Sequence, residues 1–149
     1  MIKILFICHG NICRSPMAEF VMKDLVKKAG VAENFRIASR ATHYDALGDS
    51  VYPPARRVMN RHGVPCDGHC ATLLKAEDYS QWDYLIGMDC ANLKNMHRIC
   101  GGDPDGKMSL LLEHTGQHRD VADPWYSGDF DATWQDVLAG CTALLENLR

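Results

Sequence analysis

The beginning of the chain places a buried strand, a loop and a helix in immediate succession. Residues 2–7 form an almost unbroken apolar run, which is typical of a strand covered on both faces. Residues 16–29 then carry apolar side chains at helical spacing, and Gly30 supplies a stop signal. A strand followed by a helix in this way is the unit of a parallel sheet with helices packed on it, so this segment favours an α/β fold.

The same alternation continues to the end of the chain. Further strands are predicted over residues 35–39, 84–88 and 110–112, and helices over residues 53–61, 91–99 and 137–148. With no repeat or long linker, the pattern predicts one domain over residues 1–149, with a parallel sheet as the middle of three layers. Ligands of such sheets bind beyond the carboxyl ends of the strands, which directs attention to the loops there.

Composition excludes several classes of protein. A net charge of -3 and the absence of long basic runs argue against binding to nucleic acid or to a membrane surface. No apolar segment reaches the length of a membrane span and no leader pattern is visible, so we expect a cytoplasmic protein. We also expect the protein to be a monomer or a weak dimer. The seven cysteines are odd in number and do not indicate a disulfide framework. Three of them are expected to pack as small hydrophobic side chains, namely Cys90, Cys100 and Cys141.

Cysteines in the middle of the chain raise the question of a metal site. Cys66 and Cys70 enclose His69, but their spacing is unlike a zinc site and no second close pair follows. We therefore expect no metal.

The loop after the first strand combines a thiol with features that attract an anion. Cys8 is followed by Gly10, Arg14 and Ser15, with Ser15 predicted to cap the helix and Pro16 to occupy its first position. Free backbone N–H groups and the positive end of the helix favour a bound oxyanion, and the arginine offers it two donors. The same field is expected to lower the pKa of the Cys8 thiol, giving a nucleophile beside a phosphate. A simple glycine turn with a buried cysteine is the alternative.

A second segment supplies a candidate acid. Asp123 precedes Pro124, Trp125 and Tyr126, so a carboxyl lies next to a stiff backbone and two aromatic rings that can line a cleft. Cleavage of a phosphate monoester needs a proton for the leaving oxygen, and this carboxyl can provide it. An ordinary Asp-Pro turn with core aromatics is the alternative.

Together these motifs resemble those of the low-molecular-weight protein tyrosine phosphatases. The resemblance begins with CHGNICRSP and continues in order through YPPARRVMNRHGV, AEDYSQWDYLIGMDCANL and DVADPWYSGDF. It implies a flavodoxin-like, four-stranded parallel sheet, a phosphotyrosine-bearing protein as substrate, and neither metal nor organic cofactor. It also implies that Cys8 forms a cysteinyl-phosphate, that Arg14 clamps the phosphate, and that Asp123 acts first as acid and then as base.

Further roles follow from the same resemblance. Asp89 matches a structural carboxylate near Arg14, and Asn11, Ser39 and His69 match residues that hold the phosphate loop in its strained form. Ser15 is a candidate donor to the Cys8 thiolate as well as a helix cap. Cys13 is either a passive loop residue or the partner of Cys8 in a reversible disulfide. The predicted contacts to substrate and phosphate are His9, Gly10, Asn11, Ile12, Cys13, Ser15, Trp125 and Tyr126.

The chain departs from the family pattern near the cleft. Arg40 stands where small residues are common, Thr72 where an arginine is frequent, and His9 where leucine or methionine is more usual, which bears on substrate choice and pH response. Ile12 favours phosphotyrosine, because phosphoarginine phosphatases of this fold tend to have threonine there.

Other functions compatible with the same loop remain to be tested. Arsenate reductases share the fold and pass electrons through further cysteines, for which Cys90 and Cys100 are candidates with unsuitable spacing. A phosphoarginine phosphatase, a phosphoprotein-binding module without catalysis and a flavin protein are the remaining alternatives.

Overall fold

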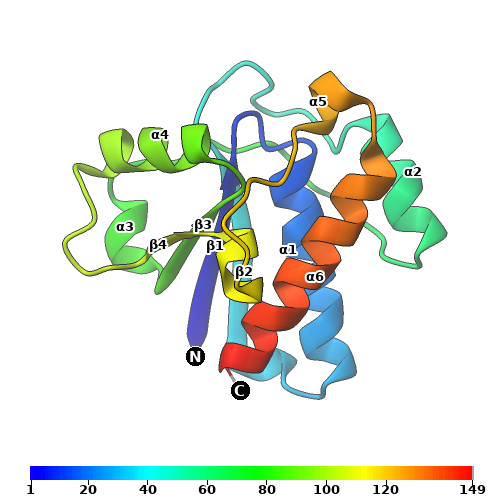
Figure 1. The fold of residues 1–149 in the computed structure, drawn as a ribbon, viewed down its shortest axis with the longest axis horizontal. Helices are drawn as coiled ribbons and strands as arrows, with labels where there is room; N and C mark the ends of the chain where they lie inside the picture. Colours follow the sequence, from blue (N-terminus) through cyan, green and yellow to red (C-terminus); the bar gives the residue numbers. More distant parts are fainter. Residues whose placement is uncertain (149) are drawn as a thin grey trace.

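The computed structural model describes residues 1–148 and has one parallel sheet at its centre (Figure 1). Its strands are β1 (Ile2–Cys8), β2 (Phe35–Ala41), β3 (Tyr84–Gly87) and β4 (Met108–Leu110). Their order in the sheet is β2-β1-β3-β4, and every neighbouring pair is parallel. The predicted four-stranded α/β architecture is confirmed.

Helices cover both faces of the sheet, which makes the three layers. On one face lie α1 (Arg14–Lys28), α2 (Pro53–Arg61) and α6 (Phe130–Leu148), and in Figure 1 these stand to the right of the strands. On the other face lie α3 (Asp78–Gln81) and α4 (Cys90–Cys100), seen to the left. The short elements η1 (Ala32–Asn34), η2 (Leu111–Thr115) and α5 (Pro124–Ser127) join them. In the described part of the chain, no helix is long and apolar enough to span a membrane.

Strand β1 shows why its sequence is apolar without alternation. Ile4 and Phe6 belong to the core on the side of α1 and α6, whereas Leu5 and Ile7 belong to the core that includes Trp82 and Met96. Successive side chains of a strand point to opposite faces. Since both faces of the central strand are covered, each position is buried.

The fourth strand lies earlier than its predicted range of 110–112. Only Leu110 belongs to both ranges, because the chain turns into the helix η2 immediately after this residue. The Glu113 carboxylate accepts a hydrogen bond from the Leu110 N–H at 3.1 Å and so caps that turn. Leu111 and Leu112 are buried under the face of the sheet that α6 covers. Their apolar character therefore reflects helix packing rather than a strand.

The closing helix also differs from its predicted bounds, since α6 begins at Phe130 rather than near residue 137. Its first turns carry polar side chains that hide the apolar period. The Asp129 carboxylate accepts a hydrogen bond from the Ala132 N–H at 2.9 Å and stabilises this earlier start.

Candidate active site

The candidate site is a cavity of about 660 Å³ at the carboxyl end of β1, where the loop into α1 meets the segment before α5. In Figure 1 the loop from β1 into α1 lies at the upper end of the sheet, the end at which α5 is also seen. Ten of the predicted site residues line this cavity: Cys8, His9, Gly10, Ile12, Cys13, Arg14, Asp89, Asp123, Trp125 and Tyr126. The other four, Asn11, Ser15, Ser39 and His69, do not line it but are joined to its loop by hydrogen bonds.

The Cys8 sulfur is the buried centre of this loop. The residue is 3% exposed, and its Sγ lies 3.0 Å from the Ser15 hydroxyl oxygen. That oxygen also accepts a hydrogen bond from the Asn11 side-chain amide at 2.7 Å. A hydroxyl carries only one proton, which is left to be donated to the sulfur.

The predicted cap role of Ser15 is wrong. Helix α1 begins at Arg14, two residues earlier than a Ser15 cap requires, and its N-cap residue Cys13 makes no side-chain capping bond. Pro16 is accordingly the third helical residue and not the first. The Ser15 side chain turns to Cys8 and Asn11 instead, so the loop and not the helix end determines its orientation.

Asn11 organises the interior of the loop. It has a φ of 59°, and no other non-glycine residue in the described chain has a positive φ. Its side-chain amide donates to Ser15 and to Ser39 at 2.9 Å, and its side-chain oxygen accepts from the Thr72 N–H at 3.0 Å. Its backbone oxygen lies 2.7 Å from His69 Nε2. The side chain is fully buried, so these bonds fix a backbone conformation that L-residues disfavour.

A buried glutamate that the sequence reading missed extends this network. Glu19 on α1 is 8% exposed, accepts a hydrogen bond from the Ser39 hydroxyl and pairs with Lys23 at 2.6 Å. One signal was available in the sequence. Glu19 stands four residues after Ser15 and three before the apolar Met22, on the inner face of the helix.

Asn11 provides a test of how the loop is held. Asn11→Gly keeps the positive φ accessible but removes the three side-chain bonds, whereas Asn11→Ala also imposes backbone strain. Urea denaturation should show both variants less stable than the parent, with Asn11→Ala worse than Asn11→Gly by about 1 kcal/mol. Equal stability of the two variants would mean that the strain is not stored at this residue.

Arg14 is held by three groups from two segments of the chain. The residue is 2% exposed, and one guanidinium nitrogen donates to the Asp89 carboxylate at 2.7 Å and to the Val121 carbonyl at 2.9 Å. The other terminal nitrogen lies 3.4 Å from the Asp123 carboxylate. Burial disfavours the charge, but Cys8, Asp89 and Asp123 together raise the pKa of Arg14 above its usual value. A fixed cation therefore lies beside the sulfur.

The two carboxylates near Arg14 also cap helices. Asp89 caps α4, accepting the Asn92 N–H at 2.7 Å with the oxygen that Arg14 does not use. Asp123 caps α5 and accepts the Trp125 N–H at 3.0 Å. Each side chain is thus held at both oxygens, which orients it toward the cavity.

Two exposed aromatic rings stand beside the carboxyl of Asp123. Trp125 is 57% exposed and Tyr126 is 86% exposed, although both line the cavity. The Trp125 ring rests on Tyr52, with their centroids 4.9 Å apart. Large aromatic side chains with free faces at the mouth of a cavity are suited to contact a planar substrate ring.

The cysteines of the chain are chemically distinct. All seven are free, and Cys13, in the same loop as Cys8, is buried. Burial, followed by the nearby Cys8 and Asp123, raises the pKa of Cys13 to about 12. The expectation that Cys90 packs in the interior is wrong, because Cys90 begins α4 and is exposed, while Cys100 is half-buried and Cys141 fully buried.

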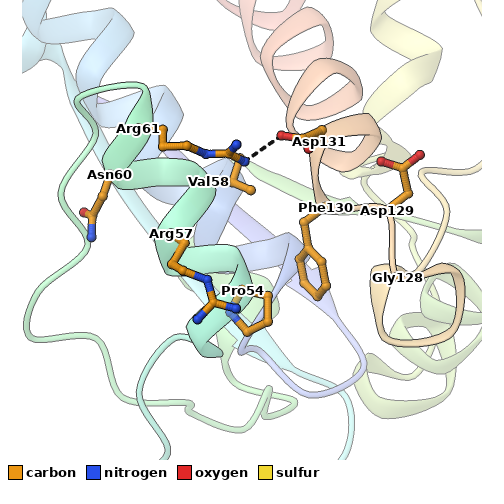
Figure 2. A pocket seen from close by; sticks show the side chains of 9 residues that line it. All are labelled: Pro54, Arg57, Val58, Asn60, Arg61, Gly128, Asp129, Phe130 and Asp131. Carbon is orange, nitrogen blue, oxygen red and sulfur yellow. Dashed lines mark hydrogen bonds and ion pairs between the residues drawn. The ribbon is translucent and has the colours of Figure 1, made fainter.

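A second hollow, of about 500 Å³, lies between α2 and the beginning of α6 (Figure 2). Figure 2 shows Arg61 and Asp131 facing each other across it, and they form an ion pair at 2.7 Å. Its lining includes no cysteine or histidine. Of these two hollows, only the cavity around Cys8 is lined by cysteine side chains.

The site combines a cysteine sulfur, a buried guanidinium and a carboxyl around a loop at the carboxyl end of a parallel sheet. These are the groups that a cysteine-dependent phosphatase needs. The family model "Low molecular weight phosphotyrosine protein phosphatase" matches residues 3–149. The chain belongs to this family, which confirms the resemblance of its motifs.

Individual relatives cover nearly the whole chain. Low molecular weight protein-tyrosine-phosphatase YfkJ of Bacillus subtilis is 32% identical in sequence, over 100% of this chain and 97% of its own. The crystal structure of YfkJ superposes with a TM-score of 0.96, over 99% of this chain and 94% of that one. The Streptococcus pyogenes enzyme SP-PTP is 37% identical, with a TM-score of 0.90, over 100% and 94% of the two chains. A Drosophila arginine phosphatase, DARP, is 27% identical, with a TM-score of 0.92, over 99% and 98%.

Proposed function

We propose that the protein hydrolyses phosphotyrosine in two steps at Cys8. In the first, the thiolate attacks phosphorus, the bond from phosphorus to the tyrosine oxygen breaks, and Asp123 gives its proton to that oxygen. In the second, water attacks the cysteinyl-phosphate, Asp123 takes the proton from the water, and the thiolate leaves with its electron pair. Inorganic phosphate is the product. The observation that carries this proposal is the convergence of Cys8, Arg14 and Asp123 on one cavity.

Arg14 has the electrostatic part in both steps. Its guanidinium is already aligned by Asp89 and the Val121 carbonyl before substrate arrives. Because this donor is already oriented, no free energy is lost in reorienting it when negative charge develops on the phosphoryl oxygens. The backbone N–H groups of the Cys8–Ser15 loop add further donors around the same oxygens.

Ser15 acts on the sulfur. Its hydroxyl lies 3.0 Å from Sγ and is held by Asn11, so it donates a hydrogen bond to a negative sulfur. A donor of this kind stabilises negative charge on its acceptor. It stabilises the sulfur both before attack and when the sulfur leaves in the second step.

The cavity favours an aryl phosphate as substrate. Trp125 and Tyr126 form one of its walls, and exposed rings of this type contact a phenyl ring at little entropic cost. Ile12, which also lines the cavity, has no hydroxyl to hold a water for attack on phosphoarginine. The relation to an arginine phosphatase keeps that substrate in the test, but these side chains support phosphotyrosine.

An electron relay to Cys8 through α4 is not supported by the positions of its cysteines. Cys90 and Cys100 are the first and last residues of that helix. Eleven residues of helix are about 15 Å long, several times the reach of a disulfide. The pair therefore cannot carry out the thiol exchange that arsenate reduction requires.

The proposed setting is the cytoplasm. All seven cysteines are free, and the mechanism needs Cys8 reduced, as cytosolic thiols are kept. The predicted monomeric or weakly dimeric state also remains a prediction, which sedimentation can test.

A side-by-side substrate assay tests the proposed function. Peptides of one sequence carrying phosphotyrosine, phosphoserine or phosphoarginine should be hydrolysed with kcat/KM highest for phosphotyrosine, by about 10²-fold or more over phosphoserine, whose short side chain does not reach the aromatic wall. Arsenate with thioredoxin and its reductase should give no reduction. Preference for phosphoarginine, arsenate turnover, or binding of phosphotyrosine without hydrolysis would each overturn the proposal. Absorbance at flavin wavelengths in the purified protein would indicate the flavin alternative.

A further inference from the structure

The residue that follows the nucleophile belongs to a cluster which the proposed mechanism does not use. His9 lines the cavity and its side chain is 49% exposed. Its Nε2 lies 2.8 Å from the Asp45 carboxylate, and its ring stacks on His43 with the centroids 4.0 Å apart and the planes at 13°. One ring face is therefore covered by His43, which leaves the rest of the ring to the cavity.

The cluster is fixed to the phosphate loop and not only to the surface. The His43 N–H donates to the His9 carbonyl at 3.0 Å, and the Thr42 N–H donates to the Cys8 carbonyl at 2.9 Å. The Thr42 hydroxyl is 2.8 Å from His43 Nδ1 and holds that ring. Asp45, like His9, lines the cavity and belongs to the loop after β2. The pair thus forms part of the cleft wall at a fixed place relative to the sulfur.

The charge of this wall depends on a single proton. Asp45 stays ionised, since the hydrogen bond with His9 lowers the pKa of its carboxyl further. Burial and then the neighbouring His9 lower the pKa of His43, which disfavours a positive charge on that ring. The charge of the pair is zero when His9 is protonated and -1 when it is neutral. Other charged groups that face the cluster or line the same cavity are Arg98, Asp49, Asp89, Arg14, Asp123 and Cys8.

We propose that His9 and Asp45 select substrates by charge, so that acidic residues beside the phosphotyrosine are accepted when His9 is protonated and disfavoured when it is neutral. The inference rests on the proposed function, because the residues flanking a bound phosphotyrosine must leave the cavity past its walls. Asp45 and Asp49 both line the cavity, and Arg14 is already committed to Asp89 and Asp123. Without the His9 proton, this side of the cleft therefore repels carboxylates.

Matched peptides measure this effect without interference from the catalytic titrations. Two phosphotyrosine peptides differ only in having glutamate or lysine on both sides of the phosphotyrosine, and the readout is the ratio of their kcat/KM values. Protonation of Cys8, Asp123 and the phosphate affects both peptides and largely cancels in the ratio, and the same measurement on a His9 variant gives the part that does not cancel. Neither glutamate nor lysine titrates between pH 5.5 and 8.

The expected change follows from Coulomb's law. One unit charge at about 8 Å in water alters each kcat/KM two- to threefold, and the two peptides respond in opposite directions. At about 20 mM salt, the ratio of the glutamate to the lysine peptide should fall about fivefold from pH 5.5 to pH 8. Most of this change should disappear at about 1 M salt, where charges are screened over a few ångströms.

Variants separate the two members of the pair. In His9→Gln, the ratio of kcat/KM for the glutamate peptide to that for the lysine peptide should be low and should change far less with pH than in the parent. In Asp45→Asn, the same ratio should be higher than in the parent at both pH values and should still fall as the pH rises. Asp105→Asn removes an exposed carboxylate outside the cavity and should behave as the parent. Asp45→Asn alters an exposed side chain, so it remains informative if His9→Gln does not fold.

Each contrary result has a distinct meaning. A flat ratio in the parent, or an unchanged pH dependence in His9→Gln, would overturn the role of His9. An Asp45→Asn ratio equal to that of the parent would overturn the role of Asp45. In these cases hydrolysis of p-nitrophenyl phosphate continues and the proposed function stands, whereas loss of that hydrolysis in the parent would overturn both.

Discussion

Cys8→Ser should abolish turnover while the protein still binds inorganic phosphate. The hydroxyl of serine is not ionised at neutral pH, so no nucleophile faces phosphorus, and the rate should fall by about 10⁴-fold or more. The oxyanion donors are not removed, because Arg14 keeps its contacts with Asp89 and Val121. Hydrolysis of p-nitrophenyl phosphate and calorimetric titration with phosphate give the two readouts.

An exposed cysteine supplies the control for this variant. Cys90 lies outside the cavity, and Cys90→Ser should leave both hydrolysis and phosphate binding as in the parent. Turnover by Cys8→Ser at the parental rate would assign the nucleophile to another group. Loss of phosphate binding together with turnover would instead mean that Cys8 holds the loop in shape.

Asp123→Ala should reduce the rate by 10²–10⁴ for substrates with poor leaving groups, the usual contribution of a general acid. Alkyl phosphates and phosphotyrosine require the proton, whereas p-nitrophenolate departs readily without it. The loss should therefore be much smaller for p-nitrophenyl phosphate. Values of kcat/KM across a series of aryl phosphates give the leaving-group dependence, because this quantity does not include hydrolysis of the cysteinyl-phosphate that all substrates share.

The nearby Asp120 tests whether any carboxylate in this segment matters. Asp120 is exposed, lies outside the cavity and accepts a hydrogen bond from the Cys90 N–H at 3.1 Å. Asp120→Ala should change kcat less than twofold for every substrate. A loss of kcat/KM in Asp123→Ala that is the same for every leaving group would show that Asp123 does not act as the acid in the first step and serves only to position Arg14 or α5.

Local sequence was sufficient for the features that depend on a short segment. The apolar run of β1 and the helical period of α1 specify the central strand and its covering helix, and the loop between them carries its chemistry within eight residues, Cys8 to Ser15. Periodicity reports burial, and both faces of a central strand are buried whatever the rest of the fold does. The predicted sheet and family are confirmed for this reason.

Features that depend on distant contacts could not be predicted in the same way. Ser15 has the composition of a helix cap, but Asn11 and Cys8 claim its hydroxyl. Leu111 and Leu112 have the composition of a strand, but the core beneath α6 buries them in a helix. In each case a tertiary contact outweighed a local conformational preference, because intrinsic preferences for helix or strand differ between residues by only a few tenths of a kcal/mol to about 1 kcal/mol.

The pairing of His9 with Asp45 illustrates the same limit at the cleft. The histidine was visible as a departure, but its partner lies 36 residues away and follows another strand. The register of β1 with β2 places Cys8 opposite Ala41, which brings the two following loops together. That His9 and Asp45 line the same wall of the cavity therefore follows from the strand pairing and not from the local sequence.

The hold on Arg14 has a consequence during synthesis of the protein. The sulfur and the guanidinium emerge from the ribosome early, but the Val121 carbonyl and the Asp123 carboxylate that contact the guanidinium are made more than a hundred residues later. A nascent or prematurely terminated chain ending after α4 contains the anion loop without these partners. Such a chain lacks the proposed proton donor, and under the proposed mechanism we expect it to hydrolyse phosphotyrosine far more slowly than the finished protein.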